Sequence, residues 1–72
     1  MEAKATWQSD MSFIGTADTG FEVRMDASET SGGHNSGFRP TELLAMGTAG
    51  CTGMDVISIL RKKRAEVKGL EV

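Results

Sequence analysis

The stretch from Pro40 to about residue 64 is the feature that most constrains the fold. Pro40 suits the first turn of a helix, and Glu42 in that turn complements the positive end of the helix dipole. Small and apolar residues then follow at helical spacing and cover more than one stripe: Leu43, Leu44, Met46, Gly47, Gly50, Cys51, Met54, Val56, Ile57, Ile59 and Leu60. A helix that is apolar over so much of its circumference is buried on several sides. The sequence therefore predicts a long, buried central helix over about residues 40–64.

Three glycines, Gly47, Gly50 and Gly53, recur every three residues within this helix and bare its backbone along one ridge. Each glycine costs about 1 kcal/mol relative to alanine in a helix. We expect a close contact to compensate for this cost: another helix, a strand, or a substrate beside Cys51. The run matches neither G-x-G-x-x-G nor a Walker loop, so phosphate binding is not expected.

Three stretches before the helix alternate between apolar and polar residues, as half-buried strands do: residues 3–7, 11–15 and 21–27. The tetrapeptide Ala17-Asp18-Thr19-Gly20 has turn chemistry at hairpin length between the second and the third. The pattern predicts a three-stranded antiparallel meander with one wet face, which includes Arg24 and Asp26. The aromatic core is then expected to come from Trp7, Phe13 and Phe21.

Two further segments complete the predicted architecture. Residues 28–38 are rich in Gly and Ser without apolar periodicity, which predicts a flexible loop, and loops of this length are often functional. Residues 67–72 begin to alternate as a further strand, which suggests that the rest of the fold is missing or comes from another chain. The prediction is a single α+β domain over residues 1–72.

Composition excludes several classes of site and partner. A 72-residue chain with one cysteine forms no internal disulfide, and Cys51 and His34 alone cannot build a four-ligand zinc site, so we expect neither a metal nor a cofactor. A chain this short buries only about 60% of its unfolded surface, which favours partner chains. Its N-terminus is polar and its longest apolar stretches run four or five residues, so a cytoplasmic location without a membrane span is expected.

The charge distribution and one tripeptide have alternative interpretations. The net charge is −2, but residues 1–60 carry −5 and residues 61–72 carry +3, with the basic run Arg61-Lys62-Lys63-Arg64. No aromatic residue interleaves this run, so a solvated helix end is favoured over a nucleic-acid site. Asp18-Thr19-Gly20 matches the active-site tripeptide of aspartic proteases, but ordinary turn chemistry explains it better.

Cys51 is the main candidate for chemistry. A buried cysteine is more often inert packing than a nucleophile, yet the small residues around Cys51 leave room for a substrate. A reactive thiol needs a nearby positive charge. Cys51 lies about 16 Å along the helix from Pro40, too far for the helix N-terminus or Arg39 of the same helix. An activating cation must come from another segment or subunit; His34 is one candidate, although a lone loop histidine is more often solvated.

Two segments, Gly37-Phe38-Arg39-Pro40-Thr41-Glu42-Leu43-Leu44 and Ala49-Gly50-Cys51-Thr52-Gly53-Met54-Asp55-Val56, resemble the OsmC/Ohr family, the osmotically induced and organic hydroperoxide resistance proteins. The resemblance covers the whole chain, and residues 55–62 look most like the less characterised OsmC-like branch. It implies an intertwined α+β homodimer with long helices at its core. It also implies thiol-dependent reduction of organic hydroperoxides, with Cys51 as the peroxidatic cysteine and a thiol reductant as partner.

The chain departs from the family pattern in three places. Members of the family are about twice as long as this chain and carry a resolving cysteine in their second half. This chain lacks that half and that cysteine. Thr41 stands where the peroxidases have a Glu directly after the Pro, with Glu42 one residue later. In the peroxidases the activating Arg comes from the N-terminal strands, but the first Arg of the early strands here is Arg24, which is predicted to face solvent. We therefore propose Arg39 of a neighbouring subunit, oriented by Glu42, as the activating cation. The alternative function is a non-catalytic structural or small-ligand-binding remnant in which Cys51 is packing.

Overall fold

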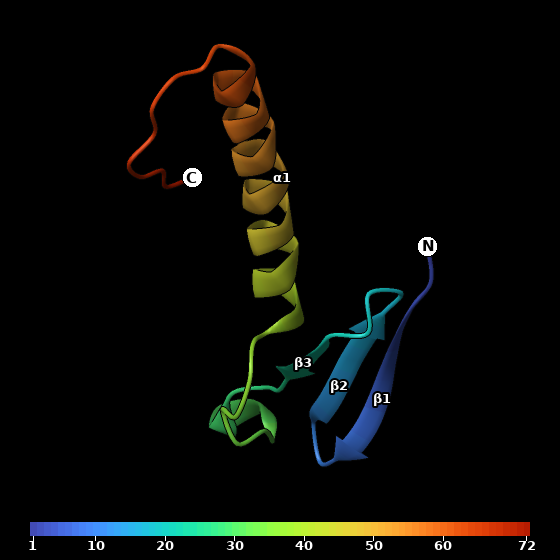
Figure 1. Cartoon of the computed structure of the whole chain (residues 1–72). Coiled ribbons are helices and arrows are strands. Elements are labelled where there is room, and N and C mark those ends of the chain that lie inside the picture. The colour runs from blue at the N-terminus through green and yellow to red at the C-terminus, as the bar shows by residue number, and fades with distance from the viewer. The chain divides into compact units, whose positions relative to one another are not determined.

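The computed structural model describes all 72 residues. In chain order the elements are β1 (Ala3–Ser9), β2 (Ser12–Ala17), β3 (Glu22–Met25), the 3-10 turn η1 (Glu29–Ser31) and the helix α1 (Pro40–Lys62) (Figure 1). The chain divides into two compact units, Met1–Glu42 and Leu43–Val72, and each is described by itself. The predicted α+β class, with a three-stranded antiparallel sheet and one long helix, is confirmed.

The sheet has the strand order β1-β2-β3 and is antiparallel throughout. Trp7 pairs with Phe13, and Phe13 pairs with Met25, so these three side chains lie on one face. Ala5, Gly15 and Val23 form the next row of the same face. The predicted turn closes with a hydrogen bond of 2.9 Å from Gly20 N to Ala17 O. The alternation of the sequence thus produces one continuous apolar face.

The predicted aromatic core is not formed within the chain. Trp7 is 62% exposed, Phe13 is 36% exposed and Phe21 is 83% exposed, and no hydrophobic residue of the chain is buried. The reason is geometric, since the three aromatic residues share the apolar face of the sheet and nothing within residues 1–42 covers it. The apolar face of the sheet is predicted correctly, but no segment of residues 1–42 covers it.

The helix α1 begins at Pro40 as predicted and ends two residues earlier than the predicted boundary. Arg64 has a positive φ of 56°, its N–H donates to Arg61 O at 3.0 Å, and Ala65 N donates to Leu60 O at 3.0 Å. This is a Schellman motif, which satisfies carbonyls at the helix end. The four residues of the basic run that follows Leu60 are all exposed, in line with a solvated helix end.

The prediction that this helix is buried is wrong for the isolated chain, since no residue of α1 is buried. The unit Leu43–Val72 contains only the helix and an irregular segment after it, which is too little material to surround a helix that is apolar on several sides. By length and composition α1 would also be able to cross a membrane, a criterion that the core helix of a soluble protein meets as well.

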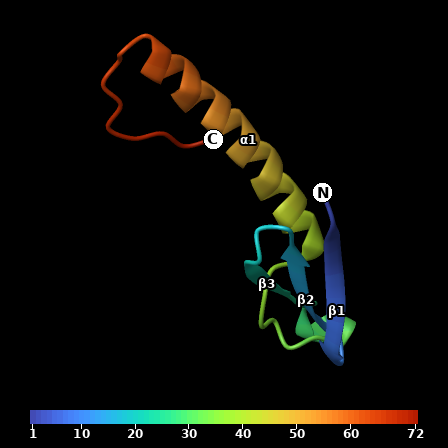
Figure 2. The same cartoon turned by 45° about the vertical axis from the view of Figure 1, so that its right-hand side comes forward.

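The strand predicted at 67–72 is absent, because residues 65–72 form no regular secondary structure. They run back alongside α1, as both views show (Figures 1 and 2). Val72 Cγ2 lies 3.6 Å from the position that a Cβ on Gly53 would occupy. A strand needs a neighbour for its N–H and C=O groups, and the unit Leu43–Val72 contains no other strand.

The loop after β3, predicted to be flexible, is folded around the carboxylate of Asp26. This residue was predicted to face solvent but is only 2% exposed. Its Oδ2 accepts hydrogen bonds from Ser36 Oγ (2.6 Å), Ser36 N (3.1 Å) and His34 N (3.1 Å), and its Oδ1 accepts one from Ala27 N (2.7 Å). The strand alternation fails here because β3 ends at Met25 and the returning loop covers the next residue.

Phe38 and two glycines seat the end of this loop against β3. Phe38 N donates to Arg24 O at 3.0 Å, and Asp26 N donates to Phe38 O at 2.9 Å. A Cβ on Gly37 would lie 2.5 Å from Arg24 O, and one on Gly33 would collide with the carbonyl of Ala27. The loop therefore needs glycine at 37 in order to lie this close to β3, and glycine at 33 in order to lie this close to Ala27, just after the strand.

Asp26 makes the stability of this unit dependent on pH. The hydroxyl of Ser36, together with the backbone N–H groups of Ala27, Ser36 and His34, holds the pKa of the Asp26 carboxyl well below its usual range. A lowered folded-state pKa contributes stability above the unfolded value, near 3.9, and this contribution is lost as the pH falls toward the folded value.

Asp26→Asn should therefore lower the urea midpoint at pH 7 and flatten its dependence on pH below about 4. The matched control is Glu22→Gln, which changes an exposed carboxylate of β3 that forms no side-chain hydrogen bond or ion pair. Unfolding curves between pH 3 and 7 measure the effect. Equal midpoints for the wild type and Asp26→Asn at pH 7 would contradict the role given to Asp26.

Candidate functional site

Cys51 lies on the exposed surface of α1 as a free thiol. The hydroxyl of Thr52 donates to Thr48 O at 3.1 Å, and that of Thr48 donates to Leu44 O at 3.0 Å. Both hydroxyls are thus engaged by the helix backbone, and Cys51 Sγ makes no hydrogen bond within its unit. The sulfur is open to a reagent or to a partner surface.

The glycine ridge beside Cys51 is also open. A Cβ added to Gly47 or Gly50 would meet no atom within 4 Å. An open hollow of about 780 Å³ lies between α1 and the C-terminal segment; Gly50, Gly53 and Leu70 are among the residues that line it, and Cys51 is not. The close contact expected at the ridge is therefore present only at Gly53, beside Val72, and Gly47 and Gly50 remain available to a group from outside the unit.

Arg39 and Glu42 are brought together at the start of α1. Glu42 Oε1 accepts a hydrogen bond of 2.8 Å from Arg39 N, while Glu42 N donates to Arg39 O at 2.9 Å. A glutamate at the third helical position that reaches back to the residue before the helix is one half of a capping box. The carboxylate therefore binds the backbone of Arg39, whereas the expectation was that it orients the guanidinium.

The guanidinium of Arg39 is held by the loop before the helix. Its Nη2 donates to Asn35 Oδ1 at 2.8 Å, and its Nη1 donates to Gly37 O at 3.3 Å. Both acceptors are uncharged, and Arg39 takes part in no ion pair of the structure. The guanidinium is thus fixed in position while its charge is not neutralised by a carboxylate.

His34, the other cation considered for Cys51, is engaged elsewhere. Its Nε2 lies 2.8 Å from Asp10 Oδ2 in the turn between β1 and β2, and both side chains are exposed. The hydrogen bond to Asp10 raises the pKa of the imidazole above its usual value, and the charges of Asp10, Asp26 and Glu29 act in the same direction. No group of three His, Cys, Asp or Glu side chains is placed to hold a metal ion.

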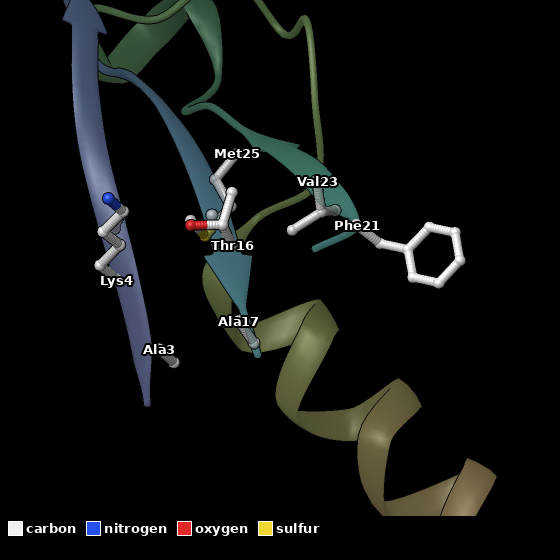
Figure 3. Close-up of a pocket in the computed structure, with 9 residues that line it drawn as sticks. Ala3, Lys4, Thr16, Ala17, Phe21, Val23 and Met25 are labelled. Carbon is white, nitrogen blue, oxygen red and sulfur yellow. The ribbon is translucent and has the colours of Figure 1, made fainter. Parts of the chain in front are cut away.

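The apolar face of the sheet carries a shallow hollow of about 450 Å³. Figure 3 shows Phe21, Val23 and Met25 on one side of this hollow and Ala3 on the other. Gly15 forms its floor, where a Cβ would lie 3.1 Å from Met25 Cε and 3.2 Å from Val23 Cγ1. Small and apolar side chains make up most of the lining of this hollow.

Sequence reasoning missed two features of this unit. A signal for the hollow was present in the sequence as small residues that pair across β1 and β2: Ala3 with Ala17, and Ala5 with Gly15. The burial of Asp26 had a weaker signal, an aspartate at the end of a strand followed by a loop rich in Ser and Gly, whose N–H and hydroxyl groups are available to a carboxylate.

Comparison with known proteins places this geometry in a family. A family described as "OsmC-like protein" matches residues 33–72, the segment with the end of the loop, α1 and Cys51. Proteins named "Protein YhfA" from Escherichia coli strain K12, Escherichia coli O157:H7 and Shigella flexneri are each 35% identical over 75 aligned residues. The alignment covers 100% of this chain and 51% of each relative, so the chain spans about half the length of these proteins. The chain belongs to the OsmC-like protein family.

Proposed function

We propose that this chain carries the peroxidatic cysteine of an OsmC-like thiol peroxidase. The observation that carries the proposal is the exposed thiol of Cys51 at the centre of α1, inside the segment that matches the family. Its helix neighbours Gly50 and Thr52 are small, so an organic hydroperoxide has room to reach the sulfur. We propose a cytoplasmic location, where thiol reductants keep cysteines reduced.

The proposed reaction transfers one oxygen atom. The thiolate of Cys51 attacks the terminal oxygen of a hydroperoxide ROOH, an S–O bond forms, and the O–O bond breaks. The leaving alkoxide takes a proton and departs as the alcohol ROH. Sulfur is oxidised by two electrons to the sulfenic acid, and the peroxide is reduced by the same two electrons.

The sulfenic acid must then be reduced by a second thiol. Cys51 is the one cysteine of this chain, so the second thiol comes from a partner chain or from a small dithiol. One thiol of the dithiol displaces water to give a mixed disulfide. The other thiol then releases Cys51 and leaves the reductant as an internal disulfide.

Arg39 is proposed to stabilise the thiolate of Cys51 across a subunit boundary. Two features support this role: Asn35 and Gly37 hold the guanidinium in place, and Glu42 leaves its charge uncompensated by binding the backbone N–H. A fixed guanidinium next to a thiolate favours the charged form of sulfur. The competing role is structural, since the same hydrogen bonds also join the loop to the start of α1.

The chain is proposed to act as a homodimer or a higher intertwined oligomer. Each unit leaves a large apolar surface uncovered, the sheet face in one and α1 in the other. The two units also carry opposite charge, −4 over residues 1–42 and +2 over residues 43–72. A helix unit of one copy thus suits the sheet unit of another in both polarity and charge.

A second candidate function is a non-catalytic structural or small-ligand-binding protein of the same fold. The observation that favours it is the isolation of Cys51, which has no hydrogen bond within its unit and no second cysteine in the chain. In that case the sheet hollow near Met25 would be the ligand site, and Cys51 would be packing in the assembled protein.

The peroxidase proposal predicts that an organic hydroperoxide oxidises Cys51 before the methionines of the chain. We expect one added oxygen atom on Cys51 at about one equivalent of peroxide, and its removal by a dithiol. Mass spectrometry of intact and digested protein measures both, with Cys51→Ser as the control. If the methionines oxidise while Cys51 remains a thiol, the proposed activity is wrong and the non-catalytic function is favoured.

The role of Arg39 predicts a shift in the pH profile of Cys51 alkylation. Arg39→Met should move the profile to higher pH and lower the alkylation rate at pH 7 by about threefold to tenfold. Arg24→Met is the matched control, because Arg24 lies exposed on the polar face of the sheet and hydrogen-bonds Ser12. Superimposable profiles for the wild type and Arg39→Met would remove Arg39 from the site.

The assembly proposal predicts that Gly50→Leu weakens self-association. A Cβ at Gly50 meets open space within the unit, and leucine favours a helix over glycine, so the isolated chain should not suffer. Overpacking a close interface costs about 1–3 kcal/mol, which corresponds to a dissociation constant roughly 5 to 150 times larger. Sedimentation equilibrium measures this constant, with Gly50→Ala as the milder variant; a stable wild-type monomer at micromolar concentration would contradict the proposal.

A further inference from the structure

One polar contact joins two segments that are far apart in the sequence, and neither of its residues has been given a role so far. His34 Nε2 lies 2.8 Å from Asp10 Oδ2, which links the loop of residues 28–38 to the turn between β1 and β2. His34 is 68% exposed and Asp10 is 60% exposed, so both groups exchange protons freely with solvent. This exposed contact ties the loop to the β1–β2 turn, whereas the buried carboxylate of Asp26 binds the backbone of the loop.

Both ends of this contact are held in place by the backbone. Asp10 has a positive φ of 48°, and its carbonyl accepts a hydrogen bond of 2.9 Å from Trp7 Nε1. His34 N donates to Asp26 Oδ2 at 3.1 Å. The two side chains therefore meet without ordering long flexible segments, which lowers the entropic cost of the contact.

The residue after His34 connects this link to Arg39. Asn35 adopts a left-handed conformation with a φ of 52°, its N–H donates to Ala27 O at 3.0 Å, and its Oδ1 accepts the hydrogen bond from Arg39 Nη2. Asparagine tolerates this conformation better than most residues because its short side chain hydrogen-bonds locally. His34 and the residue that holds the guanidinium are therefore neighbours in the same loop, so an opening of the loop at His34 would reach Asn35 next.

We propose that the His34–Asp10 contact is a protonation-dependent latch that holds the loop of residues 28–38 closed and thereby keeps the Arg39 guanidinium fixed by Asn35. Three acidic groups face the imidazole, Asp10 from the β1–β2 turn, Asp26 from the end of β3 and Glu29 from η1, and all of them favour its charged form. Protonation turns the contact into a charge-assisted hydrogen bond. This proposal concerns the loop and Arg39 only, and it does not depend on whether Cys51 reduces peroxides.

The direction of the pH response follows from the raised pKa of His34. A group whose folded-state pKa is raised contributes stability that is complete below the unfolded value, about 6.5, and is lost as the pH rises through the folded value. The latch is therefore closed below the unfolded value and weakens as the pH rises through the raised pKa of His34. The other acidic anchor, Asp26, stays ionised over this whole range because its own pKa is lowered.

The latch is tested by NMR on the intact chain. His34 is the one histidine, so a single imidazole resonance reports its titration. We expect Asp10→Asn to lower the titration midpoint of His34, and asparagine keeps the left-handed turn. We also expect the opening constant of the amides of His34, Asn35 and Ser36 to rise by about 1.5-fold to fivefold between pH 6 and 8, the size appropriate to an exposed ion pair. Exchange rates are corrected for the intrinsic effect of pH.

Two variants separate the latch from a general loss of structure. Asp18→Asn removes an exposed carboxylate from the other hairpin turn and should change neither the His34 midpoint nor the loop amides. Asn35→Gly keeps the left-handed backbone but removes the acceptor of Arg39, so it should leave the His34 midpoint unchanged and increase the mobility of the Arg39 guanidinium signals. A His34 midpoint that is equal in the wild type and Asp10→Asn would overturn the proposal, as would loop exchange that is independent of pH after correction.

Discussion

The uncovered apolar surface of this chain is the constraint on which the rest of the structure depends. Burying one large aliphatic or aromatic side chain contributes about 1.5–3 kcal/mol, and the chain by itself gains only part of this, since no hydrophobic residue is fully buried and Trp7 and Phe21 stay largely exposed. The sheet and the helix are formed, but their apolar faces are uncovered: the row through Trp7, Phe13 and Met25 on the sheet, and several sides of α1. The glycines of α1 have the same meaning, because they are costly in a helix and gain nothing from contacts inside the unit at Gly47 and Gly50.

Polar contacts order the segment that apolar packing does not. Asp26 gathers four hydrogen bonds in a site that is almost closed to water, and glycines at 33 and 37 let the backbone approach the strand. The loop then delivers Arg39 to the start of α1 with its guanidinium held by uncharged acceptors. Glu42 caps the helix through the backbone of the same residue, so the charge of Arg39 is left for another group.

Local patterns in the sequence predicted the elements well and their surroundings poorly. Alternation located the three strands of the sheet, and Pro40 with Glu42 located the start of α1, because these signals depend on neighbours within a few residues. The same alternation wrongly predicted a strand over residues 67–72, where no neighbouring strand is present. Burial of Trp7 and of α1 was mispredicted because burial requires the surface of another segment or chain, and a local sequence pattern does not show whether such a surface is present. The alternation also placed Asp26 in solvent, since it does not reveal that a loop returns over the end of a strand. Cys51 stays a prediction made from its small neighbours, and those neighbours do not specify an activating cation.

The account rests on Cys51 being activated by the folded protein, and not merely exposed by it. The most direct measurement is the second-order rate constant of Cys51 with an organic hydroperoxide, compared between the folded chain and the same chain unfolded in urea at pH 7. An activated thiol should react at least about tenfold faster in the folded, associated protein, because its thiolate fraction is raised there. Equal rate constants in the two states would contradict the account and leave Cys51 an ordinary exposed cysteine.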